Sequence, residues 1–283
     1  MPHIIVNATA DGLDYDAGAL ARARAALPAH APVVILIHGF KYAPGTPGRC
    51  PHRSILAEGA PRSHWKVAAW PRHLGFGPSE ALVIAFGWTG TGTIWQAYHR
   101  AGSAGRALAD FMDGLDRPSH ILAHSLGARV ALSALSDAAP GSVGRIILLA
   151  GTELRSVARA AMASPAGRVA DVLNVTSAEN TAFDLMLEAV LGCRGRSIGA
   201  GMGEVSGWVD LPVDRAATRA RLARLGHPIA APTRRICHWS LYLRPGLLPF
   251  YGAVIRGRVP VARLAAPLPV RESLLPFASR AAS

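Results

Sequence analysis

Residues 120–135 constrain the fold of this chain more than any other stretch. Residues 121–123 form a short apolar run that predicts a strand, and a helical pattern begins directly after Ser125. A serine at a strand-to-helix junction without a loop occupies a tight turn, and the small Ala123 and Gly127, two positions to either side, leave the space that such a turn needs. This arrangement predicts a nucleophilic hydroxyl in front of the first N–H groups of the helix. The alternative is a serine that only caps the helix.

Apolar runs of strand length alternate with helical patterns along the rest of the chain. The runs are apolar throughout, which is typical of strands buried on both faces of a parallel sheet. Half of the 283 residues are hydrophobic and 17% are charged, so the chain can form a large core. We predict a doubly wound, mostly parallel α/β sheet in a single domain, residues 1–283. The expected strands are residues 4–6, 33–37, 81–86, 121–123, 145–150, 171–176 and 203–213, and the expected helices include 14–27 and 94–115.

Two segments are expected to form a lid or the walls of a pocket. Residues 41–62 are rich in proline, glycine and histidine and predict a long loop, and loops of this length in a compact domain are usually functional. Residues 212–235 form the second segment.

The formal charge of +12 raises the question of an anionic partner. The arginines are scattered and form no run interleaved with aromatic residues, so we expect a generally basic surface and no nucleic-acid partner. Nucleic-acid binding would require the arginines of residues 215–235 to line up on one face of a helix, with a steep dependence on salt.

The three cysteines, Cys50, Cys193 and Cys237, are odd in number and far apart. This spacing predicts free thiols and neither a disulfide framework nor a metal site. The N-terminus has no signal-peptide pattern, and no apolar run is long enough to span a bilayer. We therefore expect a reduced, cytoplasmic protein with no transmembrane segment and no cofactor.

A nucleophilic serine needs a base, and the base needs an acid to hold it in the right tautomer. In this architecture the expected order along the chain is serine, acid and histidine. Only His227 and His238 lie late enough. His238, in Cys-His-Trp after the last expected strand, is the predicted base.

The acid is less clear from the sequence. Where the strand 171–176 ends, the loop position at which an aspartate is expected holds Asn180 or Thr181. Glu179 is the predicted acid, because a loop carboxylate reaches the histidine readily. Asp184, one turn into the following helix, is the alternative. It can also be explained without a catalytic role, because the helix dipole favours an acidic residue in the first turn.

Acyl transfer also needs two N–H donors for the developing oxyanion. The first is expected from Leu126, directly after the nucleophile. The second is expected from the loop after the strand 33–37, from Phe40 or its neighbour Lys41. His38 is expected to fix that loop by hydrogen bonds. Trp88, after the strand 81–86, is a candidate for lining the acyl pocket, with core packing as the alternative.

Three motifs together resemble the α/β-hydrolase superfamily: Val-Ile-Leu-Ile-His-Gly-Phe at residues 34–40, Ala-His-Ser-Leu-Gly at residues 123–127, and a late His-Trp at residues 238–239. The Ala-His-Ser-Leu-Gly form is similar to a poorly characterised bacterial branch of that superfamily. The resemblance covers about residues 4–251. It implies a serine hydrolase fold with Ser125 as nucleophile, His238 as base and an oxyanion hole at Phe40 and Leu126.

The sequence therefore predicts a hydrolase that cleaves a small-molecule carboxylic ester or thioester through an acyl-enzyme. The alternative is a non-catalytic binding or scaffold protein with the same fold. The two hypotheses differ in whether Ser125, His238 and a carboxylate lie within hydrogen-bond reach of one another. The sequence leaves the substrate and the oligomeric state open.

Overall fold

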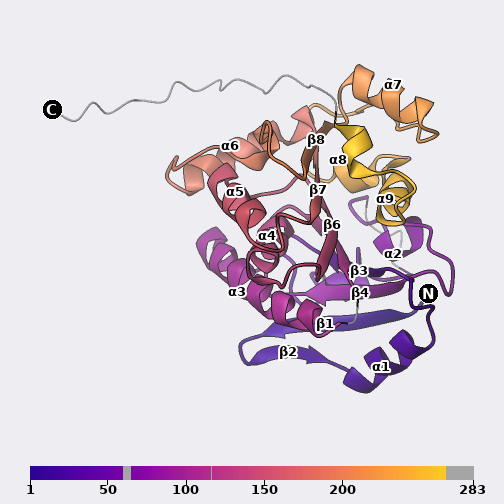
Figure 1. Cartoon of the computed structure of the whole chain (residues 1–283). Coiled ribbons are helices and arrows are strands. Elements are labelled where there is room, and N and C mark those ends of the chain that lie inside the picture. The colour runs from indigo at the N-terminus through magenta and orange to yellow at the C-terminus, as the bar shows by residue number, and fades with distance from the viewer. Residues whose placement is uncertain (60–64, 116, 266–283) are drawn as a thin grey trace.

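One eight-stranded sheet runs through the molecule (Figure 1). The computed structural model describes residues 1–59, 65–115 and 117–265. Across the sheet the strand order is β2-β1-β4-β3-β5-β6-β7-β8. The edge strand β2 is antiparallel to β1, and the other neighbouring pairs are parallel, which confirms the predicted mostly parallel α/β sheet. The strands are β1 (His3–Thr9), β2 (Gly12–Tyr15), β3 (Val33–Ile37), β4 (Leu82–Gly87), β5 (Ser119–His124), β6 (Val143–Leu149), β7 (Asp171–Thr176) and β8 (Trp208–Pro212).

Helices cover both faces of the sheet, because its central strands are apolar on both sides. In β3, Ile35 packs into the core on one face and Leu36 into the core on the other. The cores on these two faces are formed with α3, α4 and α5 on one side and with α2, α8 and α9 on the other (Figure 1). The helices are α1 (Ala17–Ala25), α2 (Trp70–His73), α3 (Ile94–Asp113), α4 (Gly127–Asp137), α5 (Arg155–Ala163), α6 (Thr181–Val190), α7 (Ala216–Arg224), α8 (Ser240–Leu243) and α9 (Leu247–Ile255).

The predicted boundaries differ most from the structure at α1 and β8. The helix expected from residue 14 begins at Ala17, where Asp16 caps α1 by accepting a hydrogen bond from the Ala19 N–H at 2.7 Å. Asp14 belongs to β2, a short edge strand that the sequence analysis did not predict. In place of the expected strand 203–213 the structure has the shorter strand β8, because the residues before Trp208 form an irregular loop.

The strand order determines where a reaction site can form. From β3 the chain continues to β4 on one side, and from β5 it continues to β6 on the other side. The carboxyl ends of β3 and β5 therefore flank the point at which the strand order reverses, where open α/β sheets bind their ligands. In the β3–β5 register, Ile37 lies beside Ala123. Two residues further along each strand, this register sets Gly39 against Ser125.

Gly127 allows the helix after β5 to approach β3 closely. A Cβ atom at this position would lie 2.7 Å from the carbonyl oxygen of His38 and 3.0 Å from that of Ile37. Any larger residue would therefore push the start of α4 away from the sheet, and with it Ser125.

The two segments expected to form a lid or pocket walls have little regular structure. Residues 41–59 contain the 3₁₀ turn Pro51–Arg53, whereas residues 60–62 lie outside the described residues. Residues 212–235 contain α7, and the residues after it form neither a helix nor a strand. Within the described ranges, no helix has the length and apolar character needed to cross a bilayer.

Candidate active site

Ser125 lies between the last residue of β5 and the first residue of α4, with φ at +55°. This left-handed backbone is rare for a serine, and its neighbours hold it in place. The N–H of Ser125 donates to Leu149 of β6 at 3.0 Å, and its carbonyl oxygen accepts from the N–H of Thr152 at 3.0 Å. The backbone on both sides of the serine is therefore tied to β6 and the residues that follow it.

Gly39 makes room for the nucleophile. A Cβ atom on Gly39 would lie 2.6 Å from Ser125 Cβ and 3.2 Å from Ser125 Oγ. The side chain of Ser125 therefore rests directly against the backbone of the loop after β3. Thr152, which the sequence analysis did not single out, has its Oγ1 atom 3.4 Å from Ser125 Oγ.

His238 is within hydrogen-bond distance of the serine. Its Nε2 atom lies 2.7 Å from Ser125 Oγ, and the Phe183 ring stacks on the imidazole with centroids 4.5 Å apart. His124, the residue before the serine, donates from Nε2 to the backbone carbonyl of His238 at 3.0 Å. Burial, and to a lesser extent the nearby His124, hold the pKa of His238 well below its usual value of 6.5. The other late histidine, His227, instead packs against Phe250.

The third member of the chain of hydrogen bonds is an amide. Asn180 Oδ1 lies 2.6 Å from His238 Nδ1. Because an amide oxygen only accepts, Nδ1 carries the hydrogen and Nε2 presents its lone pair to the serine hydroxyl. Asn180 is the residue immediately before α6, at the loop position where the sequence analysis expected an aspartate.

Glu179 does not occupy the place predicted for it. Its carboxylate accepts hydrogen bonds from Arg244 and, at 3.0 Å, from Ser177 Oγ, and all three residues are buried. The backbone of Glu179 still supports the site, since its carbonyl oxygen accepts from the N–H of Cys237, next to His238. The physical reason for the difference is the buried guanidinium of Arg244, which requires a carboxylate partner.

Asp184 contacts His238 only indirectly, through Asn180. Its Oδ1 atom accepts from Asn180 Nδ2 at 3.0 Å and from Ser197 Oγ at 3.3 Å. The backbone of Gly199 lies close enough that a Cβ atom there would be within 2.4 Å of the carboxylate atoms. A carboxylate accepts hydrogen bonds and does not donate them, so Asp184 turns the NH₂ group of Asn180 toward itself and the oxygen toward His238.

Two backbone N–H groups remain available beside the serine. In the described part of the chain, the N–H groups of Phe40 and Leu126 have no hydrogen-bond partner in the protein, whereas that of Lys41 donates to the Gly90 carbonyl at 2.7 Å. Phe40 and Leu126 are therefore the two candidate donors for an oxyanion, and the Lys41 N–H is not one of them.

His38 and Trp88 shape the loop that carries Phe40. The Nε2 atom of His38 accepts a hydrogen bond from the backbone N–H of Trp88 at 3.1 Å, and the Trp88 indole N–H donates to the His38 carbonyl oxygen at 3.0 Å. The two rings also stack, with centroids 5.4 Å apart. Burial lowers the pKa of His38 to about 3, so the ring is neutral. Trp88 is only 1% exposed and belongs to the core, which favours core packing over the predicted role in the acyl pocket.

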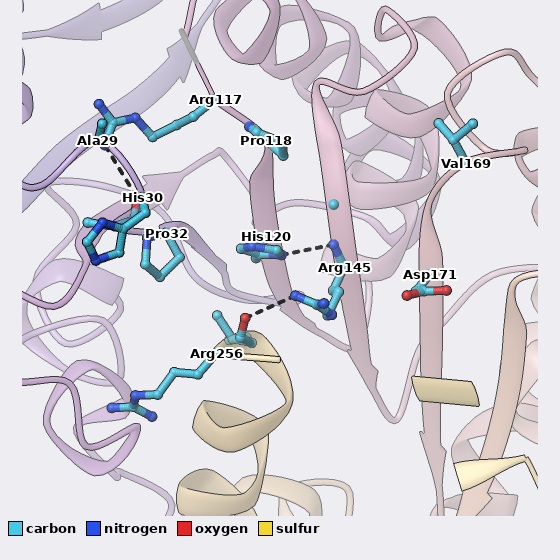
Figure 2. A pocket seen from close by; sticks show the side chains of 13 residues that line it. Ala29, His30, Pro32, Arg117, Pro118, His120, Arg145, Val169, Asp171 and Arg256 are labelled. Carbon is cyan, nitrogen blue, oxygen red and sulfur yellow. Dashed lines mark hydrogen bonds between the residues drawn. The ribbon is translucent and has the colours of Figure 1, made fainter. Parts of the chain in front are cut away.

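A cavity of about 490 Å³ lies at the opposite end of the strands (Figure 2). Its lining includes His120 near the start of β5, Arg145 of β6 and Asp171 at the start of β7. Its basic side chains are largely engaged by the fold: Arg145 donates to the Ile255 carbonyl at 3.2 Å, and Arg117 donates to that of Pro28 at 3.0 Å. We assign this cavity no part in the chemistry of Ser125.

A scan of protein-family models and searches of curated proteins and of solved structures found no match to this chain. A serine, a neutral imidazole in the correct tautomer and two unengaged N–H groups together can perform covalent acyl transfer.

Proposed function

We propose that the protein is a serine hydrolase of the α/β-hydrolase type that cleaves carboxylic esters or thioesters of small molecules. The observation that carries the proposal is the 2.7 Å hydrogen bond between Ser125 Oγ and His238 Nε2, at a serine with left-handed backbone. A serine that served only as a helix cap would need neither the histidine nor this backbone conformation.

In the acylation step, Ser125 Oγ attacks the carbonyl carbon of the substrate while its proton passes to His238 Nε2. The carbonyl electron pair moves onto oxygen, and the N–H groups of Phe40 and Leu126 stabilise this oxyanion. When the carbonyl re-forms, the bond to the alcohol or thiol breaks, and His238 returns the proton to that leaving group. The product is an ester between Ser125 and the acyl group.

In the deacylation step, His238 Nε2 takes a proton from water, and the resulting hydroxide equivalent attacks the acyl-enzyme. The carboxylic acid leaves, and the proton returns to Ser125 Oγ. Asn180 keeps the hydrogen of His238 on Nδ1 during both steps, so Nε2 stays the atom that exchanges protons. Residues 41–62 and 212–235 are our candidates for the pocket walls.

A fluorophosphonate probe, which reacts covalently with activated serines, tests the proposal. We expect the purified wild-type protein to be labelled, and Ser125→Ala and His238→Ala to lose labelling while remaining folded. Ser103→Ala, which removes an exposed hydroxyl from α3, is the matched control and should label normally. A folded wild-type protein that fails to label would support the non-catalytic binding protein instead, and labelling that survives Ser125→Ala would place the nucleophile elsewhere.

A further inference from the structure

Lysine is rare in this chain, and both lysines lie beside the proposed active site. Lys41 and Lys66 are the two lysines among 30 lysine and arginine residues. Lys41 directly follows the oxyanion donor Phe40 and is exposed. Lys66 Nζ lies 3.8 Å above the ring of Trp239, the residue after His238.

Lys66 belongs to a cluster that we call the cationic rim, formed by Trp65, Lys66, Arg234 and Trp239. The two indole rings meet edge to face with centroids 5.6 Å apart. Lys66 Nζ lies 5.1 Å from the Trp65 centroid, and the Arg234 guanidinium lies 4.2 Å from it on the same ring. The rim adjoins the catalytic imidazole, since the rings of Trp239 and His238 are 5.9 Å apart.

The positive charge of this region is not neutralised by the carboxylates of the site. In the described part of the chain, neither Lys41 nor Arg234 has a carboxylate within 4.0 Å. The carboxylates of Glu179 and Asp184 are buried and bind Arg244 and Asn180. An aromatic ring attracts a cation without cancelling its charge, so Arg234 keeps a positive potential in the rim beside His238.

We infer that the substrate of this hydrolase carries an anionic group, a carboxylate or a phosphate, which the cationic rim and Lys41 attract. The inference rests on the proposed function. The aromatic faces hold the cations of Lys66 and Arg234 in place, which reduces the conformational entropy lost when they bind an anion. Neutral esters of the same size would bind without this contribution.

Matched substrates test the inference. Mono-4-nitrophenyl adipate and 4-nitrophenyl hexanoate share a leaving group and a six-carbon acyl chain and differ in a terminal carboxylate. Butyryl-4′-phosphopantetheine and butyryl-pantetheine share the thioester and differ only in the phosphate of the leaving group. We expect at least one pair to favour the anionic member in kcat/KM, by about five- to tenfold at low salt, and the preferred pair distinguishes a carboxylate from a phosphate.

Variants of the rim locate the effect. Lys66→Gln and Arg234→Gln should each lower the anionic-to-neutral ratio about two- to threefold, whereas Lys66→Arg, which keeps the charge, should retain most of it. Arg258→Gln, the same change of charge at an exposed position after α9, is the control and should leave the ratio unchanged.

Three results would overturn the inference. The first is an enzyme that is labelled at Ser125 but has the same kcat/KM for both members of each pair. The second is a preference that Lys66→Gln and Arg234→Gln leave unchanged. Stimulation by anionic phospholipid vesicles without any preference among soluble substrates would also overturn it, in favour of membrane docking. A protein that is not labelled at all contradicts the proposed function itself, so the two failures are distinguishable.

Discussion

The pair Asn180 and Asp184 offers the sharpest test of how His238 is oriented. In the wild type, the amide oxygen of Asn180 faces His238 because its NH₂ group donates to Asp184. Exchanging the two residues, as Asn180→Asp with Asp184→Asn, keeps the hydrogen-bond chain but places a carboxylate next to the imidazole. Each single variant breaks the chain: Asn180→Asp sets two carboxylates at hydrogen-bond distance, and Asp184→Asn removes the group that forces the amide to face one way.

The size of the effects follows from these contacts. A hydrogen bond to an ionised group is stronger than a neutral one by about 1–1.5 kcal/mol, which corresponds to about five- to tenfold in rate. We expect Asp184→Asn to lose about that factor in kcat/KM, because the charge-assisted bond that orients Asn180 is lost. The exchanged double variant should gain a similar factor over the wild type, because its carboxylate stabilises the imidazolium that forms in the transition state.

The assay is kcat/KM for 4-nitrophenyl hexanoate against pH, normalised to the concentration of sites that react with the fluorophosphonate probe. In the double variant the acid limb should also move to higher pH, since a neighbouring carboxylate raises the pKa of His238. Asp137→Asn, at an exposed position at the end of α4, is the control. A double variant no more active than the weaker single variant, or a coupling energy near zero, would refute the argument.

Three further predictions concern the surroundings of the serine. Gly39→Ala should lower kcat/KM in the ester assay by on the order of a hundredfold and cost about 1–3 kcal/mol of stability, because the new methyl group displaces Ser125. Near-normal activity would contradict the close approach. Glu179→Ala should destabilise the protein by about 3–5 kcal/mol in urea unfolding, since it leaves Arg244 buried and unpaired, and unchanged stability would argue against that pair. Because the pKa of His238 is lowered, its neutral form persists below pH 6.5, so the wild-type acid limb should lie below 6.5; a limb at or above 6.5 would contradict the burial of the ring.

The strands of the central sheet were predictable because their signal is local. An uninterrupted apolar run such as β3 has to be covered on both faces, and a parallel sheet between helices is the fold that covers it. The edge strand β2 lacked that signal, because Gly-Leu-Asp-Tyr contains an acidic residue and a glycine and is only partly buried. It forms a strand because it pairs with β1. The boundary of α1 was misjudged for the same reason.

The aromatic residue after β4 shows a different limit. Its position after β4 predicts that Trp88 lies at the carboxyl edge of the sheet, and the structure places it at that edge. Its orientation depends on His38, 50 residues earlier in the chain, whose carbonyl accepts from the indole and whose ring stacks on it. Nothing in the sequence near Trp88 reports that contact, so a pocket residue and a core residue had the same local pattern.

The histidine's partner was mispredicted because the prediction required a charge where the fold requires a fixed orientation. Arg244, six residues after His238, is buried by the C-terminal helices and takes the carboxylate of Glu179. Asn180 then meets the imidazole, and an amide is adequate there only if it is prevented from flipping. Asp184 meets that condition from one helical turn further on, which places it on the same side of the helix start as Asn180. An asparagine at the expected acid position, followed four residues later by an aspartate, is therefore the local signal that identifies this arrangement.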